Sequence, residues 1–351
     1  MSRLLLVGVT GYVGGTVLSQ LLSSTKSSTR SLRIDLLVRC KHLAQLLRSA
    51  YGERINIIFW TGLDDTDFIE ETAAQYDIIV NAGTGFNTEG AKAFVDGLAH
   101  RAKNGRAMPW MLHISGCSNL IDPSQKPFEW DDGRDGQAIF DHMKSLDAKD
   151  PYPQRTAEIT VLGTAVERGV QAPILTGYVL SHQISHDRPA DHTLVTQVHI
   201  FDLADYFVLL IRTVLGCPDR GIGYIPTGKE DIVFPTVGRA LMTDINQLAL
   251  NAAFGSGILP REDTPQQKEI HLVNVHEIAD ELTAGFVEVA QRGWGGEKAV
   301  KGTIGQELLG WKPKRQQEAW DEDFYDELVA LQEGRRGKTI VSCIGAPVDE
   351  P

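Results

Sequence analysis

Three glycines, Gly8, Gly11 and Gly14, stand three residues apart in the segment GVTGYVG. They follow an apolar run at 3–9 and precede a helical hydrophobic pattern that begins at Val13. Glycines in such a turn let the backbone bend tightly and approach a pyrophosphate, whose charge is favoured by the amides and dipole of a helix N-terminus. The spacing predicts a dinucleotide-binding turn, and a tight turn without a ligand is the alternative.

The end of the second apolar run indicates which dinucleotide would bind. An acidic residue there holds a ribose 2′-hydroxyl, whereas a basic one accommodates a 2′-phosphate. The run at 32–39 ends in Arg39, with Lys41 close behind, while Asp35 lies inside the run. We therefore expect NADP rather than NAD as the cofactor. The alternative is that Arg39 is a solvated loop charge.

Apolar runs alternate with helical patterns over the first half of the chain. The runs expected to be strands are 3–9, 32–39, 55–60, 77–83, 110–115 and 172–180, and the expected helices are 41–51, 65–75, 87–103 and 153–169. Strands that are apolar throughout and alternate with helices form a parallel sheet covered on both faces. We predict an α/β fold, a Rossmann doubly wound parallel sheet, over residues 1–180.

The rest of the chain is less regular. The polar stretch at 123–137 is too irregular for a strand, and its acidic cluster at 129–135 is interpreted as a solvated lid. Residues 181–331 are predicted to form a smaller mixed α/β substrate lobe packed closely on the sheet. The polar tail at 332–351 is predicted to be partly disordered.

Composition excludes several classes of protein. With 351 residues, 42% of them hydrophobic, the chain can bury a sizeable core. Its 34 basic and 46 acidic residues give a charge of −12, which repels nucleic-acid phosphates, so nucleic acid is not an expected partner. The partner that we expect, from the predicted dinucleotide site, is a small organic substrate. No run approaches the ~20 apolar residues of a membrane span, and the four cysteines form no CxxC pair. We expect a cytoplasmic protein without a metal site, and homo-oligomerisation stays open.

Several segments together resemble one known family. VTGYVGG is similar to its glycine motif, and NAGTG (81–85) and HISGCS (113–118) to the ends of its fourth and fifth strands. ILTGYVLS (174–181), VHIFDLADYFVLLI (198–211) and LGWKPK (309–314) are similar to its later segments. On these segments the chain resembles the extended and atypical short-chain dehydrogenase/reductases, including the NmrA-like branch. The likeness covers nearly the whole chain.

The resemblance implies a set of cofactor-binding residues. The pyrophosphate would be lined by Gly8, Thr10, Gly11, Tyr12, Val13 and Gly14, and Asn81, Ala82 and Gly83 would run beneath the cofactor. Arg39 would face the adenosine phosphate. The acid that the family places beside the adenine is replaced by Gly62 before Leu63, with Asp64 as a substitute acid.

The proton-transfer pair of this family is missing. Members carry a tyrosine and, four residues later, a lysine that lowers the tyrosine pKa while hydride crosses from nicotinamide. None of the eight tyrosines here has a lysine at that spacing. The family's acid four residues after the lysine matches Glu158, which puts Gln154 at the lysine position and Asp150 at the tyrosine position. Gln154 could bond a ribose but supplies no cation, and Tyr152 with Arg155 is not a shifted pair.

Other groups are candidates for proton transfer. Ser115 matches the family's substrate-polarising serine, with Cys117 and Ser118 as rivals, or else it only caps the end of a strand. Tyr178 lies in the substrate loop by resemblance, where it could donate a proton or simply line the pocket. Tyr152 is the second candidate donor.

These observations predict an NADP-dependent reductase of a small or medium organic carbonyl, or of a related C=N or C=C bond, with an unusual proton donor. Two alternatives stay open. One is a non-redox enzyme on the same fold, such as an isomerase, dehydratase or cyclase. The other is an NADP-binding sensor or regulator of the NmrA kind, which needs the glycine turn but no acid-base residues.

Overall fold

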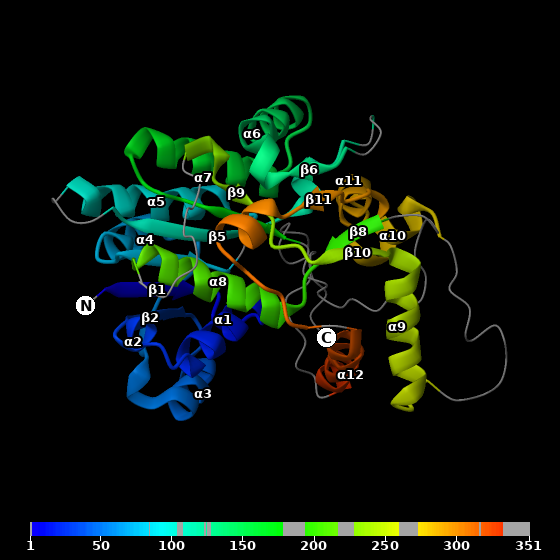
Figure 1. Ribbon diagram of the computed structural model, residues 1–351, viewed down its shortest axis with the longest axis horizontal. Coiled ribbons are helices and arrows are strands. Elements are labelled where there is room, and N and C mark those ends of the chain that lie inside the picture. The colour runs from blue at the N-terminus through cyan, green and yellow to red at the C-terminus, as the bar shows by residue number, and fades with distance from the viewer. Residues whose placement is uncertain are drawn as a thin grey trace.

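A seven-stranded, fully parallel sheet organises the chain in the computed structural model (Figure 1). The structure describes residues 2–83, 85–103, 108–122, 124, 128–177, 194–216, 228–259, 273–315 and 317–332. In chain order the strands are β1 (Arg3–Val7), β2 (Arg33–Val38), β3 (Asn56–Phe59), β4 (Ile78–Asn81), β5 (Trp110–Gly116), β7 (Ile174–Gly177) and β9 (Ile232–Val233). Their order in the sheet, β3-β2-β1-β4-β5-β7-β9, reverses between β1 and β4. The predicted doubly wound Rossmann sheet is confirmed.

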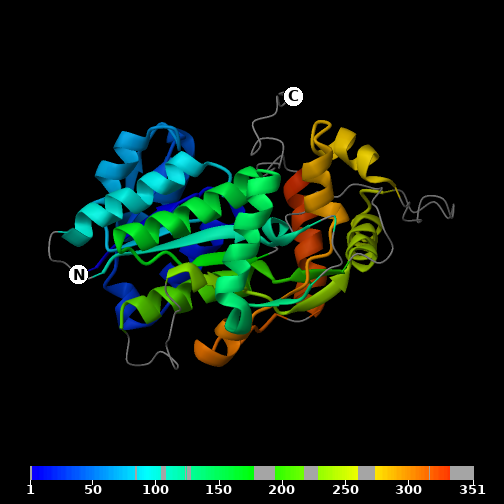
Figure 2. The same ribbon diagram turned by 90° about the horizontal axis from the view of Figure 1, so that it is seen from above.

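Helices cover both faces of this sheet (Figures 1 and 2). One face carries α1 (Tyr12–Ser23), α3 (Lys41–Tyr51) and α8 (Ile200–Val214), and the other carries α4 (Thr66–Ala73), α5 (Thr88–Lys103), α6 (Asp132–Lys149) and α7 (Pro153–Arg168). Strand β1 serves both layers, since Leu4 and Leu6 pack with α1 and α8, whereas Leu5 and Val7 pack with α4 and α5. The two-residue period of a strand thus explains its unbroken apolar sequence.

A smaller group of elements lies beside the sheet (Figure 2). Strand β8 (Leu194–Gln197) pairs antiparallel with β10 (Gly238–Leu241), and β6 (Trp130–Asp131) pairs parallel with β11 (Val300–Lys301). The helices of this lobe are α9 (Met242–Gly255), α10 (Val275–Leu282), α11 (Val287–Ala290) and α12 (Gln317–Gln332). Since α8 and β9 also come from beyond residue 180, the second half of the chain contributes to the sheet as well as to the lobe.

Short helical segments complete the described structure. They are α2 (Ser27–Arg30), η1 (Gly52–Arg54), η2 (Cys117–Leu120), η3 (Gly228–Glu230), and two π-helical turns, η5 (Gln291–Gly295) and η6 (Ile304–Leu308). Among the described helices, every one is too short or too polar to cross a membrane. The predicted disordered tail lies outside the described residues from 333 onward.

The acidic segment at 129–135 is not the solvated lid that the sequence suggested. It holds β6 and the start of α6, where Asp131 caps the helix by accepting from the backbone N–H two residues on, at 3.0 Å. Asp132 is 3% exposed, and its carboxylate oxygens accept from the backbone N–H groups of Phe234, Thr303 and Ile304. The lid prediction was wrong because Asp131 caps a helix and Asp132 accepts hydrogen bonds from distant backbone rather than from water.

Candidate active site

The glycine turn joins β1 to α1 at the carboxyl edge of the sheet. Gly8 has a φ of +80°, and its carbonyl oxygen accepts from the N–H of Gly11 at 2.9 Å. A Cβ at Gly14 would overlap the carbonyl of Gly8, and a Cβ at Gly8 would overlap the carbonyl of Ala82. Glycine is required at both positions because the backbones of β1, α1 and the loop after β4 meet there.

The N-terminus of α1 is open to a ligand. Gly11 is its N-cap residue, no described side chain caps the helix, and its first turn holds no acidic residue. The first N–H groups of a helix have no intrahelical partner, and the helix dipole is positive at this end. A phosphate fits such a terminus, and the close approach at Gly8 and Gly14 leaves the backbone itself as its lining. The predicted pyrophosphate residues, 8 and 10–14, therefore lie together.

Arg39 follows β2 and is exposed at the same edge. Its side chain runs beside the loop after β3, since a Cβ at Gly62 would lie 3.9 Å from Arg39 Cδ and 4.0 Å from its Nη1. Arg39 makes no hydrogen bond or ion pair with the residues that the structure describes. The guanidinium is therefore available to an anion from outside the chain.

Asp35, the acid within β2, accepts hydrogen bonds from two other side chains of the protein. Its side chain is buried, and its Oδ2 accepts from Nη2 of Arg3 at 3.1 Å and from the hydroxyl of Tyr76 at 2.6 Å. Although burial raises it, hydrogen bonds from Tyr76 and Arg3 hold the pKa of Asp35 below its usual value. Asp35 lies within the strand, as the sequence predicts, and because its side chain is buried it cannot hold a ribose at the strand end.

Asn81 shapes the loop after β4. It is buried, its Oδ1 accepts from the N–H of Gly83 at 3.3 Å, and its Nδ2 lies 3.0 Å from Nδ1 of His113. Burial lowers the pKa of His113 to about 4, so the imidazole is neutral. Asn81 therefore holds Ala82 and Gly83 against the glycine turn, and His113 is a core residue.

The loop after β3 brings Leu63 to this edge, half-buried against the start of α5. Asp64 is exposed and accepts from Nδ2 of Asn87 at 3.0 Å. Asp65 caps α4 by accepting from the N–H of Phe68 at 3.4 Å. Asp64 and Asp65 therefore stabilise local structure, and Leu63 follows β3, which is next to β2 in the sheet.

Gln154, in the first turn of α7, reaches the carboxyl edge between β4 and β5. A Cβ at Gly85 would lie 3.3 Å from its Cγ, and one at Gly116 would lie 3.1 Å from its Nε2. Ser118 donates its hydroxyl hydrogen to Oε1 of Gln154 at 2.8 Å. The Nε2 of Gln154 has no partner among the described residues and remains available as a donor.

Ser115 lies behind that edge in a buried polar cluster. Its hydroxyl donates to Oε2 of Glu158 at 2.5 Å, and Thr176 donates to Oε1 at 3.1 Å. Nδ2 of Asn119 donates to Ser115 Oγ at 3.0 Å and also to Glu158. Burial raises the pKa of Glu158. Both hydroxyls already donate their single hydrogen, Ser115 to Glu158 and Ser118 to Gln154, but Ser115 is buried whereas Ser118 is only half-buried.

Tyr152 is enclosed rather than open. It is 2% exposed, and the guanidinium carbon of Arg292, from the lobe, lies 4.6 Å from its ring centre. Arg292 also pairs with Asp150. Arg155 is 1% exposed and pairs with Asp147 at 3.4 Å. Tyr152 and Arg155 therefore pack the junction of α6, α7 and the lobe, and Tyr178 lies outside the described residues.

Two lobe cations were not singled out in the sequence, Arg292 and Lys298. Lys298 is buried, its ammonium donates to the carbonyl oxygens of Gly293 (2.8 Å) and Gly296 (3.2 Å), and burial lowers its pKa to about 8. Its neighbour Cys117 is buried at the end of β5, and burial raises the thiol pKa to about 12. The neighbouring sequence does not indicate that Arg292 and Lys298 are buried, because a basic residue among glycines is typical of an exposed loop.

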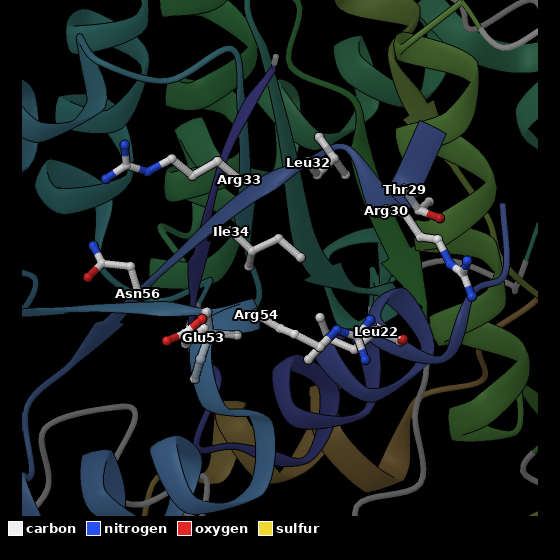
Figure 3. A pocket seen from close by; sticks show the side chains of 10 residues that line it. Leu22, Thr29, Arg30, Leu32, Arg33, Ile34, Glu53, Arg54 and Asn56 are labelled. Atoms are coloured by element: carbon white, nitrogen blue, oxygen red, sulfur yellow. Dashed lines mark hydrogen bonds between the residues drawn. The ribbon is translucent and has the colours of Figure 1, made fainter. Parts of the chain in front are cut away.

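A cavity of about 340 Å³ lies at the opposite edge of the sheet, near the amino ends of β2 and β3 (Figure 3). Arg30 and Arg33 point to different sides of it, and Arg54 donates to the carbonyl of Leu22. Its basic side chains do not converge on one point. The candidate site is therefore the carboxyl edge and not this cavity.

Comparisons with known proteins agree with this architecture. No family model matches the chain. A curated relative, Oxidase ucsJ from Acremonium sp, is 24% identical over 345 residues, which cover 89% of this chain and 92% of that protein.

Solved structures match nearly the whole chain. They include dTDP-glucose 4,6-dehydratase DesIV from Streptomyces venezuelae with NAD bound, with a TM-score of 0.61, 13% identity and coverage of 95% of this chain and 100% of that one. UDP-glucuronic acid 4-epimerase from Bacillus cereus with NAD has a TM-score of 0.58 and 12% identity, with coverage of 95% of this chain and 98% of that one. Yeast methylglyoxal/isovaleraldehyde reductase Gre2 with NADPH has a TM-score of 0.55 and 13% identity, with coverage of 96% of this chain and 100% of that one. The chain shares their fold. At these identities the likeness establishes the fold alone.

Proposed function

We propose that this chain is an NADP-dependent oxidoreductase of the atypical short-chain dehydrogenase/reductase type, acting on a small or medium organic carbonyl or a related C=N or C=C bond. The observation that carries the proposal is the cradle at the carboxyl edge of the sheet. There the close approach at Gly8 and Gly14, the uncapped start of α1 and Arg39, which has no partner among the described residues, lie on adjacent strand ends.

Each part of the edge has a role in this proposal. The glycine turn and the first N–H groups of α1 hold the diphosphate, and Arg39 holds the 2′-phosphate. Leu63, which is half-buried, would contact the adenine, and the loop at 81–83, held by Asn81, would support the cofactor. Nε2 of Gln154, whose Oε1 accepts from Ser118, would donate to the nicotinamide ribose. When bound, the nicotinamide supplies the hydride.

The comparisons support a nicotinamide cofactor but not the choice between the two forms. DesIV and the epimerase are described with NAD, and Gre2 with NADPH. The choice therefore depends on Arg39, the cation that follows β2 in this chain.

For polarising the substrate we propose Ser118 in place of Ser115. The hydroxyl of Ser115 is committed to Glu158, whereas Ser118 lies half-buried beside Gln154 and can exchange that bond for one to a substrate oxygen. Tyr178 stays our proposed proton donor. The enclosure of Tyr152 under Arg292 argues for a packing role instead.

The decisive experiment compares the binding of NADPH and NADH to the wild type and to Arg39→Ser by titration calorimetry. We expect the variant to lose at least about tenfold in NADPH affinity, because a charge-assisted contact to the phosphate disappears, with NADH affinity unchanged. Arg30→Ser, an exposed arginine at the other edge of the sheet, is the matched control and should change neither affinity. Equal losses for both cofactors would refute the role of Arg39.

A second candidate is a protein that binds NADP without net redox, either an isomerase, dehydratase or cyclase or a sensor. The observation that favours it is Gln154, a neutral amide at the position where the family resemblance places a cation. NADPH oxidation followed by absorbance over a panel of carbonyl, imine and enone substrates separates the two. Tight NADP binding with no oxidation on the whole panel would reject the reductase.

A further inference from the structure

Tyr12 in the glycine turn is tied to the C-terminal helix. It is the first residue of α1, and its hydroxyl lies 3.1 Å from Oδ2 and 3.4 Å from Oδ1 of Asp323 in α12. The hydroxyl donates to the carboxylate. This bond connects two positions that are 311 residues apart in the sequence, one of them at the proposed diphosphate site.

The apolar face of α12 anchors the helix at this position. Trp320, Phe324 and Leu328, spaced four residues apart, are buried in one core with α9. The imidazole of His199, at the start of α8, packs edge-on against Trp320 at 5.5 Å, and its Nε2 lies 3.3 Å from the carbonyl oxygen of Ala319. Because these contacts fix the helix, Asp323 is held beside Tyr12 independently of the bond between them.

The charge of α12 has one sign. Between Gln317 and Gln332 the helix contains no lysine or arginine, and its acidic residues are Glu318, Asp321, Glu322, Asp323, Asp326 and Glu327. Asp323 is separated from the start of α1 by the length of the Tyr12 side chain. At low ionic strength, where the Debye length is about 30 Å, a diphosphate at that helix start would be repelled by the carboxylate. The carboxylate therefore opposes the ligand that the glycine turn attracts.

We propose that α12 forms an outer wall of the cofactor site and that Asp323 determines how fast the cofactor exchanges. The inference rests on the proposed function, because it takes the glycine turn as the diphosphate site. The carboxylate orients Tyr12 through the hydrogen bond and raises the free energy of the bound cofactor through its charge. It thereby speeds cofactor release, a step that limits turnover in many enzymes.

The test uses the full chain and three variants. Asp323→Asn removes the charge and keeps an oxygen that accepts from Tyr12, Tyr12→Phe removes the bond and keeps the charge, and Glu322→Gln removes an exposed charge one residue away. NADPH release is followed by stopped-flow fluorescence, and the dissociation constant by titration. Thermal unfolding verifies that each variant is folded.

We expect Asp323→Asn to bind NADPH about threefold to tenfold more tightly at low salt, mainly through slower release. The difference from the wild type should shrink in 1 M salt, where the Debye length is about 3 Å. Tyr12→Phe should not bind more tightly, and Glu322→Gln should change binding less than twofold. A salt-independent effect, or unchanged or weaker binding by folded Asp323→Asn, would overturn the inference while leaving the proposed function intact. If the wild type binds neither NADPH nor NADH, both fail.

Discussion

The hydroxyl of Ser115 donates a 2.5 Å hydrogen bond to Oε2 of Glu158, behind the edge where Ser118 meets Gln154. Two serines three residues apart thus have different environments. Ser115 belongs to a buried cluster in which it is one of the hydrogen-bond donors to the Glu158 carboxylate, whereas Ser118 lies half-buried at the candidate site. Their separate roles can be measured through stability.

We predict that Ser115→Ala lowers the free energy of unfolding by about 1–3 kcal/mol, because Glu158 loses a hydrogen-bond donor in a place that water does not reach. Ser118→Ala should cost less than about 1 kcal/mol, since water can replace its hydroxyl at a half-buried position. Urea unfolding of both variants and the wild type gives the two values. Equal losses would contradict this distinction.

The sheet could be predicted from the sequence because its signal is local. Leu4, Leu5, Leu6 and Val7 are each buried, on alternating faces, and such a run between helical patterns is typical of a parallel strand covered on both sides. The glycine turn is equally local, since Gly8 and Gly14 meet within one strand-turn-helix unit. These features need no knowledge of distant segments.

The features that the sequence did not reveal depend on distant partners. Helix α6 has a polar sequence, and its Asp132 becomes a buried residue only because Phe234 and Thr303 present backbone N–H groups more than a hundred positions away. Tyr152 is enclosed by Arg292 from the lobe. No local sequence pattern predicts contacts between such distant residues. The sequence therefore could not show that Tyr152, a candidate proton donor, is buried.

Replacing Gly14 and replacing Gly11 with alanine should have different effects on stability and on cofactor binding. Gly14→Ala places a Cβ onto the carbonyl of Gly8 and should destabilise the fold by several kcal/mol or prevent folding. At Gly11, φ is −95° and a Cβ would lie 3.3 Å from the same oxygen, so Gly11→Ala should fold with a loss of about 1 kcal/mol or less. It should nevertheless weaken NADPH binding at least about tenfold, because the methyl group blocks the backbone approach to phosphate. Thermal unfolding and cofactor titration measure the two effects, and a Gly11→Ala protein with normal affinity would refute the site.

Asp35 should matter for stability and not for the cofactor. Asp35→Asn leaves Arg3 and Tyr76 without their buried carboxylate and should cost about 3 kcal/mol at pH 7. Since the folded pKa of Asp35 is lowered, its stabilisation is present above the unfolded pKa and disappears as the pH falls through the folded pKa. The gap between wild type and variant in urea unfolding should therefore narrow towards acidic pH. NADPH and NADH affinities should stay as in the wild type, and a change in cofactor preference would contradict the assignment of that role to Arg39.

Asp132 should show the opposite pH dependence. Burial raises its pKa to about 6 even though three backbone N–H groups donate to the carboxylate. A raised folded pKa means that the contribution to stability is greatest below the unfolded value and is lost as the pH rises through the folded pKa. Between pH 4 and pH 7 the unfolding free energy of the wild type should therefore fall, relative to Asp132→Asn, by up to about 3 kcal/mol, or two pKa units. The difference in unfolding free energy between the two proteins, measured with urea at each pH in this range, cancels the contributions of all other titrating groups. A difference that does not vary with pH would mean that the Asp132 carboxyl titrates normally, and that its three hydrogen bonds fully compensate for burial.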